Sequence, residues 1–407
     1  MRTTASVRSR MKRTAVATLL CAATVTAFGQ TRYLVDEPGV WKPWKPFSAI
    51  ASARTERGAT PAEVKAFEAT LLELNAILRR ASGVATPRGY SVQTWGHLNG
   101  YRALVPGQPT GRSLPLAGAL TFGAFPIFEY TRAGKMVRED SGETALFEFQ
   151  VNELEPWLIG DRRPTEWEGV ETDAFLQPQP NGDVAGIPRY GDIAVLKKNP
   201  ASLWVPMPIQ AAIDLVATVR QTQLEERRQT VASQQRSYDV WKTPAKRTER
   251  MAGYKAVAAA LPDGAKYLAT VDKQEKEIET ALAKEAGPDS SAAKDIRALE
   301  ASLAELKTWL GELSVADRQA PACYATGGAT LRTRFRTGAS PDCQPLARPN
   351  RQFFSASAPR SAAQVVIIGQ IASCFDHQPA STSPAGCAAN RQLLQTLDKE
   401  AVLSLLK

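Results

Sequence analysis

Residues 208–317 constrain the fold most, because they read as a series of charge-rich helices with a long apolar seam. The spacing of apolar side chains predicts four helices, at residues 209–240, 244–261, 265–286 and 291–313. In the last helix the apolar residues alternate spacings of three and four, which places them on one face. This seam contains Ile296, Leu299, Leu303, Leu306, Leu310 and Leu313.

The third predicted helix keeps the same spacing, but Glu275 occupies one of its seam positions. The sequence Gly-Pro-Asp-Ser at residues 287–290 is a helix stop followed by a new start. We therefore expect residues 265–286 and 291–313 to pair as an antiparallel hairpin about 33 Å long.

The part of the chain before these helices has a different pattern. Thr60, Pro61 and Glu63 form a capping box with proline at the first helical position, and an apolar stripe continues to Arg80. Beyond this helix, short runs rich in β-branched and aromatic residues predict strands at residues 90–95, 120–130, 144–151 and 193–196. One helix among so many strands favours an antiparallel α+β domain.

The N-terminal 29 residues have the features of a cleaved signal peptide. Five positive charges precede an apolar run of about 15 residues, which is shorter than the roughly 20 needed to span a bilayer. We expect export to the periplasm or the medium and no transmembrane segment in the mature chain. The leader carries five of the nine net positive charges, so the mature chain carries about +4, which argues against nucleic-acid binding.

Four cysteines of the mature chain lie close to its C-terminus: Cys323, Cys343, Cys374 and Cys387. An even number of cysteines in an exported chain predicts two disulfides. Three pairings are possible, and we favour pairing between sequence neighbours because this closes short, loop-rich segments. A zinc site would need tighter ligand spacing, so we expect no metal and no cofactor.

These features predict an α+β fold with four segments. A signal peptide (1–29) precedes an antiparallel sheet domain with an N-terminal helix (30–206), a helical region with a hairpin (207–317) and a small disulfide-containing basic region (318–407). The last region either packs on the sheet domain or forms a separate body. Residues 318–407 hold a net charge of +6, so residues 30–317 hold −2.

Two groups of residues are candidates for binding. Trp41 and Trp44 lie in an extended, proline-spaced segment that either stacks on a ligand or packs on the domain as a strap. If residues 330–336 form a strand, its period of two places Arg332, Arg334 and Arg336 on one face. That face would attract an anionic envelope component or an acidic partner, unless neighbouring acids pair with it.

Signals for catalysis are weak. The chain has two histidines, His97 and His377, and the common nucleophile, zinc and nucleotide motifs are missing from the sequence. Asp376 could orient His377, and His97 ends a predicted strand beside Trp95. We expect a non-catalytic binding or scaffolding protein of the cell envelope, with a partner protein or an anionic envelope component as its ligand. The alternative is an envelope hydrolase whose site is assembled from these scattered residues.

Overall fold

The structure is a computed structural model that describes residues 32–101, 110–140, 145–154, 163–168, 171–338, 341–369, 371–375 and 384–407. The predicted signal peptide, Asp376 and His377 lie outside the described residues. The described chain combines helices with antiparallel sheets, which confirms the α+β class. Among its helices, none has the length and apolar character needed to cross a membrane.

The chain divides into two compact units. Of the described residues, unit 1 comprises those between 32 and 154 together with those in 178–203 and 350–407, and unit 2 comprises those in 163–177 and 204–349. The segment boundaries expected from the sequence stay a prediction, but contacts in the structure group residues 350–407 with the large sheet and residues 322–349 with the helices.

Unit 1 is built on an antiparallel sheet that has nine strands among the described residues. Its order is β1-β3-β5-β14-β9-β8-β7, and β2 and β4 also pair with β3. The strands are β1 (Arg32–Tyr33), β2 (Tyr90–Leu98), β3 (Gly118–Arg132), β4 (Lys135–Asp140), β5 (Ala145–Val151), β7 (Pro180–Val184), β8 (Ile187–Tyr190), β9 (Ile193–Lys197) and β14 (Val365–Gly369). All strands expected from the sequence in this unit are present.

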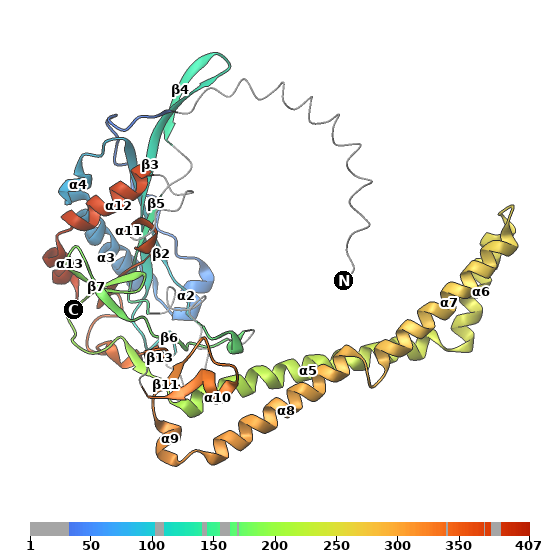
Figure 1. Cartoon of the computed structure of the whole chain (residues 1–407). Helices are drawn as coiled ribbons and strands as arrows, with labels where there is room; N and C mark the ends of the chain where they lie inside the picture. Colours follow the sequence, from blue (N-terminus) through green and yellow to red (C-terminus); the bar gives the residue numbers. More distant parts are fainter. Residues whose placement is uncertain are drawn as a thin grey trace. The chain divides into compact units, whose positions relative to one another are not determined.

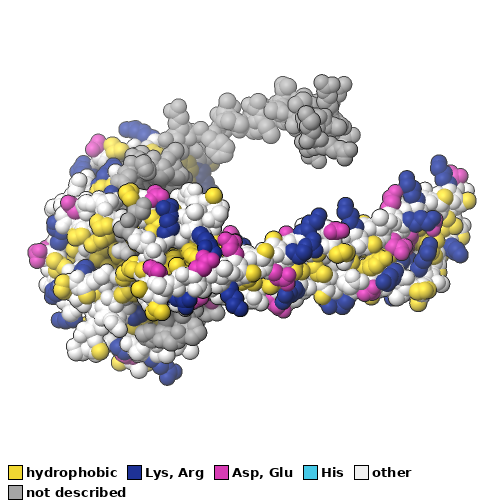
Figure 2. All heavy atoms as spheres, turned by 60° about the horizontal axis from the view of Figure 1, so that its bottom comes forward, with side chains coloured by type: hydrophobic (Ala, Val, Ile, Leu, Met, Phe, Trp, Pro, Cys, Tyr) yellow, Lys and Arg dark blue, Asp and Glu magenta, His cyan; other side chains and the backbone are white. Residues whose placement is uncertain are grey.

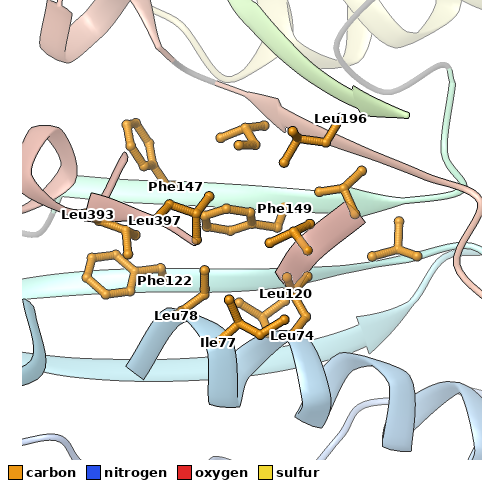
Figure 3. Packing of buried hydrophobic residues seen from close by; sticks show 14 of the residues in the cluster. Leu74, Ile77, Leu78, Leu120, Phe122, Phe147, Phe149, Leu196, Leu393 and Leu397 are labelled. Carbon is orange, nitrogen blue, oxygen red and sulfur yellow. The ribbon is translucent and has the colours of Figure 1, made fainter. Parts of the chain in front are cut away.

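Helices cover one face of this sheet. Figure 1 shows α3, α4, α12 and α13 gathered on the same side of the strands. Figure 3 shows the core between them, where α3 side chains meet aromatic rings from β3 and β5. The helices of unit 1 are α2 (Ala51–Arg57), α3 (Pro61–Arg80), α4 (Ser82–Ala85), α11 (Ala372–Phe375), α12 (Pro384–Thr396) and α13 (Lys399–Leu405), with a 3-10 turn, η3, at Arg351–Phe353.

The start of α3 is confirmed as predicted. The Thr60 side chain accepts a hydrogen bond from the Glu63 backbone N–H, and the Glu63 carboxylate accepts one from the Thr60 N–H. The apolar stripe of α3 is buried in the core, with Phe67, Leu71 and Leu78 fully shielded from solvent. A local cap and a local stripe therefore determine both the beginning and the buried face of this helix.

Unit 2 combines a smaller sheet with long helices. The small sheet has the order β10-β13-β11-β12, and β6 also pairs with β13. Its strands are β6 (Phe175–Leu176), β10 (Trp204–Pro206), β11 (Ala322–Tyr324), β12 (Phe335–Thr337) and β13 (Gln344–Pro349). The helices are α5 (Ile209–Trp241), α6 (Pro244–Ala259), α7 (Gly264–Ala286), α8 (Ser291–Glu312), α9 (Val315–Gln319) and α10 (Leu331–Arg334), with a 3-10 turn, η2, at Thr165–Trp167.

The helical region is confirmed, but the expected pairing of its last two long helices is wrong. Helix α8 packs along α5, and α7 packs on α6 and the end of α5. Ion pairs join the outgoing and returning helices at Arg228–Glu300 and Arg250–Glu275. The linker at residues 287–290 therefore joins two successive returning helices. We call residues 209–312, which contain α5 to α8, the helical arm.

Each disulfide joins two cysteines that follow one another along the chain, which confirms the favoured pairing. Cys323 pairs with Cys343 in unit 2, and Cys374 pairs with Cys387 in unit 1, where it joins α11 to α12. The two bridges therefore belong to different units, although their cysteines form one cluster in the sequence.

Candidate functional site

The tryptophan segment lies beside β2 as a parallel strap. The Lys42 N–H donates to Val92 O at 2.7 Å, and the Ser48 N–H donates to Gly96 O at 3.0 Å. Trp41 donates its indole N–H to Val84 O at 2.8 Å, and its ring meets Phe122 edge to face. Trp41 and Trp44 are half-buried and pack against the core of unit 1. This packing accounts for both rings, and a role in ligand binding stays a prediction.

The expected strand carrying three arginines is wrong. Arg332 and Arg334 lie in α10, and only Arg336 lies in β12, because Thr330 and Thr333 form a capping box that starts a helical turn. The arginines pair with different carboxylates, namely those of Glu312, Glu166 and Asp342. They therefore share no strand face. Binding of an anion by these residues stays a prediction.

His97 lies in β2 and is half-buried. Its strand register places it on the sheet face opposite to the helices. His97 is opposite Ala119 of β3, which in turn is opposite Gln150 of β5. Neighbouring strands are about 4.8 Å apart, so the Cα atoms of His97 and Gln150 are about 10 Å apart. The other candidate histidine, His377, lies outside the described residues, and so does Asp376.

A second row on the same face adds further polar groups. Trp95 of β2 is opposite Thr121 of β3, and Thr121 is opposite Glu148 of β5. Thr121 is only 1% exposed, and its hydroxyl oxygen finds no hydrogen-bond partner among the described residues. The two rows bring an imidazole, a hydroxyl, a carboxylate and an amide onto one face. We call these residues, His97, Thr121, Glu148 and Gln150, the polar face.

A chain of hydrogen bonds extends from the polar face to the end of α2. The Gln150 amide donates to Glu148 Oε2 at 2.7 Å, and the Asn99 amide donates to Gln150 Oε1 at 3.2 Å. Asn99 Nδ2 also lies 3.4 Å from Glu153 Oε2, which accepts from Arg57 Nη2 at 2.9 Å. The carboxylates of Glu148 and Glu153 are thus linked through two amide side chains.

Two guanidinium groups lie close to the ring of Tyr101 at the end of this chain of hydrogen bonds. The guanidinium carbons of Arg57 and Arg351 are 5.1 Å and 5.3 Å from the centre of its ring. Burial lowers the pKa of Arg57, and the Glu153 carboxylate opposes this effect. Burial also lowers the pKa of Arg351, which Tyr101 opposes. The arrangement holds one buried and one half-buried cation beside one aromatic ring and one carboxylate.

The chemistry available on the polar face is that of an acid, a base and hydrogen-bond donors. His97 and Glu148 can move protons, and the Thr121 hydroxyl can donate to or accept from a bound group. Among the described residues, no cluster of three or more His, Cys, Asp and Glu side chains could hold a metal ion.

Sequence reasoning identified His97 and missed its neighbours. The alternation in β5 was a usable signal, because Glu148 and Gln150 occupy the face opposite to Phe147 and Phe149. Arg57 carries no comparable signal, since it ends a short helix far from Glu153 in the sequence.

Comparison with family models, curated proteins and solved structures finds no match to this chain.

Proposed function

We propose that this chain is an exported, non-catalytic protein that binds a partner in the cell envelope through its helical arm. Export is supported by the N-terminal charge and hydropathy pattern together with two disulfides, because such bridges persist in oxidising compartments. Binding through the arm is supported by how little of the arm is buried within its own unit.

The small core of unit 2 uses only one end of the arm. The first turns of α5 contribute Ile209, Ile213 and Val216 to this core, and the last turns of α8 contribute Leu306 and Trp309. Between Leu224 and Leu306 only five side chains are buried: Ala258, Val271, Glu275, Ser290 and Ala292. Most helices in proteins are stabilised by packing an apolar face against other elements. The part of the arm between Leu224 and Leu306 instead leaves an unusual amount of its apolar face exposed to solvent.

Apolar side chains are also exposed along the arm. Figure 2 shows them interleaved with Lys, Arg, Asp and Glu side chains on the visible face of the arm. Acidic and basic residues are equal in number over 209–312, so the arm has no net charge. A neutral surface with exposed apolar residues favours a protein partner over a polyanion. The large exposed ones are Val240, Val257, Leu261 and Ile278.

A retention assay tests this proposal. A variant replaces the four exposed apolar residues of the arm with serine, and the purified full chain is mixed with washed envelope from the producing cell. A matched control replaces Val35, Val40 and Met136, which lie outside the arm and are more exposed than the four arm residues. Surface replacements of this kind change stability little, so we expect both variants to fold.

We expect the arm variant to lose most of its retention and the control to keep it. Equal retention of the unmodified chain and the arm variant would contradict the proposal. Equal loss in both variants would point to nonspecific apolar adsorption and would contradict it as well.

The polar face favours a second candidate function, an envelope hydrolase. The observation in its favour is that His97 shares a sheet face with Glu148 and with a buried Thr121 hydroxyl that has no hydrogen-bond partner among the described residues. Purified protein would then release soluble fragments from isolated envelope, and His97→Asn would abolish this release. Absence of release by the unmodified chain would eliminate this candidate.

A further inference from the structure

A concave pocket in unit 1 lies where the ends of β8 and β9 meet α13. Its volume is about 350 Å³, which is within the range of small-molecule sites. Apolar side chains and charged side chains both contribute to its walls. The lining includes Tyr190, Lys197, Lys198, Lys399, Glu400 and Leu403.

Backbone carbonyls anchor all three lysines of this pocket. Lys198 Nζ donates to Leu406 O at 2.7 Å, and Lys399 Nζ donates to Ala185 O at 2.8 Å. Lys197 Nζ donates to the carbonyls of residues 199, 200 and 201. An ammonium group has three donors, so Lys198 and Lys399 each keep two for another acceptor, whereas Lys197 uses all three. Burial lowers the pKa of Lys197.

The turn between β7 and β8 is shaped to hold Lys399. Ala185 and Gly186 have φ values of 52° and 72°, as the two central residues of a type I′ hairpin turn require. The turn presents the Ala185 carbonyl to the ammonium group. A Cβ at Gly186 would lie 2.7 Å from Lys399 Nζ, so glycine leaves the room that this lysine occupies.

The pocket has a surplus of positive charge. Glu400 is the one acidic residue among the described residues of its lining. The ion pairs of the described lysines do not include Lys197, Lys198 or Lys399. Anchored cations lose little conformational freedom when a ligand binds, so the pocket is preorganised for negative charge. Leu403 and the ring of Tyr190 add apolar surface beside these cations.

We propose that this pocket binds a small molecule that carries a carboxylate or phosphate group attached to an apolar part. The anionic oxygens accept from the free donors of Lys198 and Lys399, and the apolar part contacts Leu403 and Tyr190. This inference is independent of partner binding by the helical arm, which belongs to unit 2.

Calorimetric titration of the full chain tests the pocket with three probes. Phenyl phosphate and benzoate carry the two anionic groups on the same ring, and benzyl alcohol is a neutral counterpart. We expect saturable binding of at least one anion and none of the alcohol. Saturation by benzoate alone assigns the site to carboxylates, and saturation by phenyl phosphate alone assigns it to phosphate esters.

The double variant Lys198→Gln, Lys399→Gln keeps side-chain amide donors and removes both charges. Loss of charged hydrogen bonds is expected to weaken binding by about 10-fold or more. The matched control Lys135→Gln, Lys255→Gln removes two exposed lysines outside the pocket and should leave the affinity unchanged.

Three results would overturn the proposal: no saturable binding of either anion, equally tight binding of the alcohol, or equal weakening in the control variant. Amide chemical-shift changes in the unmodified chain give a readout that needs no variant. Shifts at Tyr190 and Leu403 on addition of the anion support the pocket, and shifts confined to other residues contradict it.

Discussion

Arg250 of α6 and Glu275 of α7 form a two-pronged ion pair inside the helical arm. Arg250 Nη2 lies 2.9 Å from Glu275 Oε2, and Arg250 Nε lies 3.1 Å from Oε1. The same guanidinium donates to Trp241 O and stacks on the Trp241 ring at 3.7 Å. Glu275 is only 5% exposed. The ion pair therefore explains why the Glu275 carboxylate occupies a position in an apolar seam. Its partner, Arg250, lies on the outgoing helix next to the break between α5 and α6.

Glu275→Gln should loosen the outer half of the arm. The change removes the charge that pairs with Arg250, and we expect a loss of about 2 kcal/mol in local stability. Hydrogen exchange of the amides in α6 and α7 measures this loss. The double variant Arg250→Met, Glu275→Leu should recover most of it, because an apolar pair of similar size avoids the desolvation of both charges. Unchanged exchange in Glu275→Gln would contradict a stabilising pair.

Glu166 should make the stability of unit 2 depend on pH. Burial raises the pKa of this carboxyl, but hydrogen bonds from Arg334, the Glu166 backbone and Tyr324 outweigh burial and leave the pKa below its usual value of 4.5. Because the folded pKa is the lower one, this stabilisation is present above about pH 4.5 and is lost as pH falls through the folded pKa.

Denaturant unfolding between neutral and acidic pH, compared with Glu166→Gln, measures this contribution. The difference in unfolding free energy between the two proteins should be largest near neutral pH and should shrink on acidification. Glu312→Gln is the matched control, because Glu312 pairs with Arg332 at an exposed position. If Glu166→Gln changed the unfolding free energy by the same amount at every pH, this would contradict a pH-dependent stabilisation by the Glu166 carboxylate.

Gly39→Ala should displace the tryptophan strap from β2. A Cβ at residue 39 would lie 1.8 Å from Tyr90 O, which is backbone and cannot move without disturbing the strand. We expect a red shift of tryptophan fluorescence and easier quenching by iodide, because Trp41 would lose its contacts with the core. Gly134→Ala is a suitable comparison, since a Cβ there meets no neighbouring atom, although its φ of 77° adds local strain. An unchanged spectrum in Gly39→Ala would contradict the close approach.

Each disulfide should stabilise its own unit. Cys323 and Cys343 are 20 residues apart in sequence, so their removal as an alanine pair should cost about 3 kcal/mol through the added freedom of the unfolded chain. Hydrogen exchange should report this loss in unit 2. The pair Cys374→Ala, Cys387→Ala should show its loss in unit 1. Equal losses in both units from either variant would contradict the assignment of one bridge to each unit.

Local patterns in the sequence determined the elements that depend on neighbouring residues. The capping box at Thr60 and Glu63 starts α3, and the helix buries the apolar stripe read from the sequence. Pairing of neighbouring cysteines was predictable for the same reason, since short loops close at low entropic cost. The alternation of Phe147 and Phe149 with Glu148 and Gln150 is a local pattern of the same kind, and it assigns the two pairs to opposite faces of β5.

Tertiary structure alone decided which distant segments meet. Glu275 marked an anomaly in the seam, but only the fold places Arg250 beside it and pairs α8 with α5. Register across β2, β3 and β5 places His97 on the same sheet face as Glu148 and Gln150, and no spacing in the chain encodes that arrangement. Caps and periodicity act over one or two turns, whereas these contacts depend on the packing of many residues far apart in sequence.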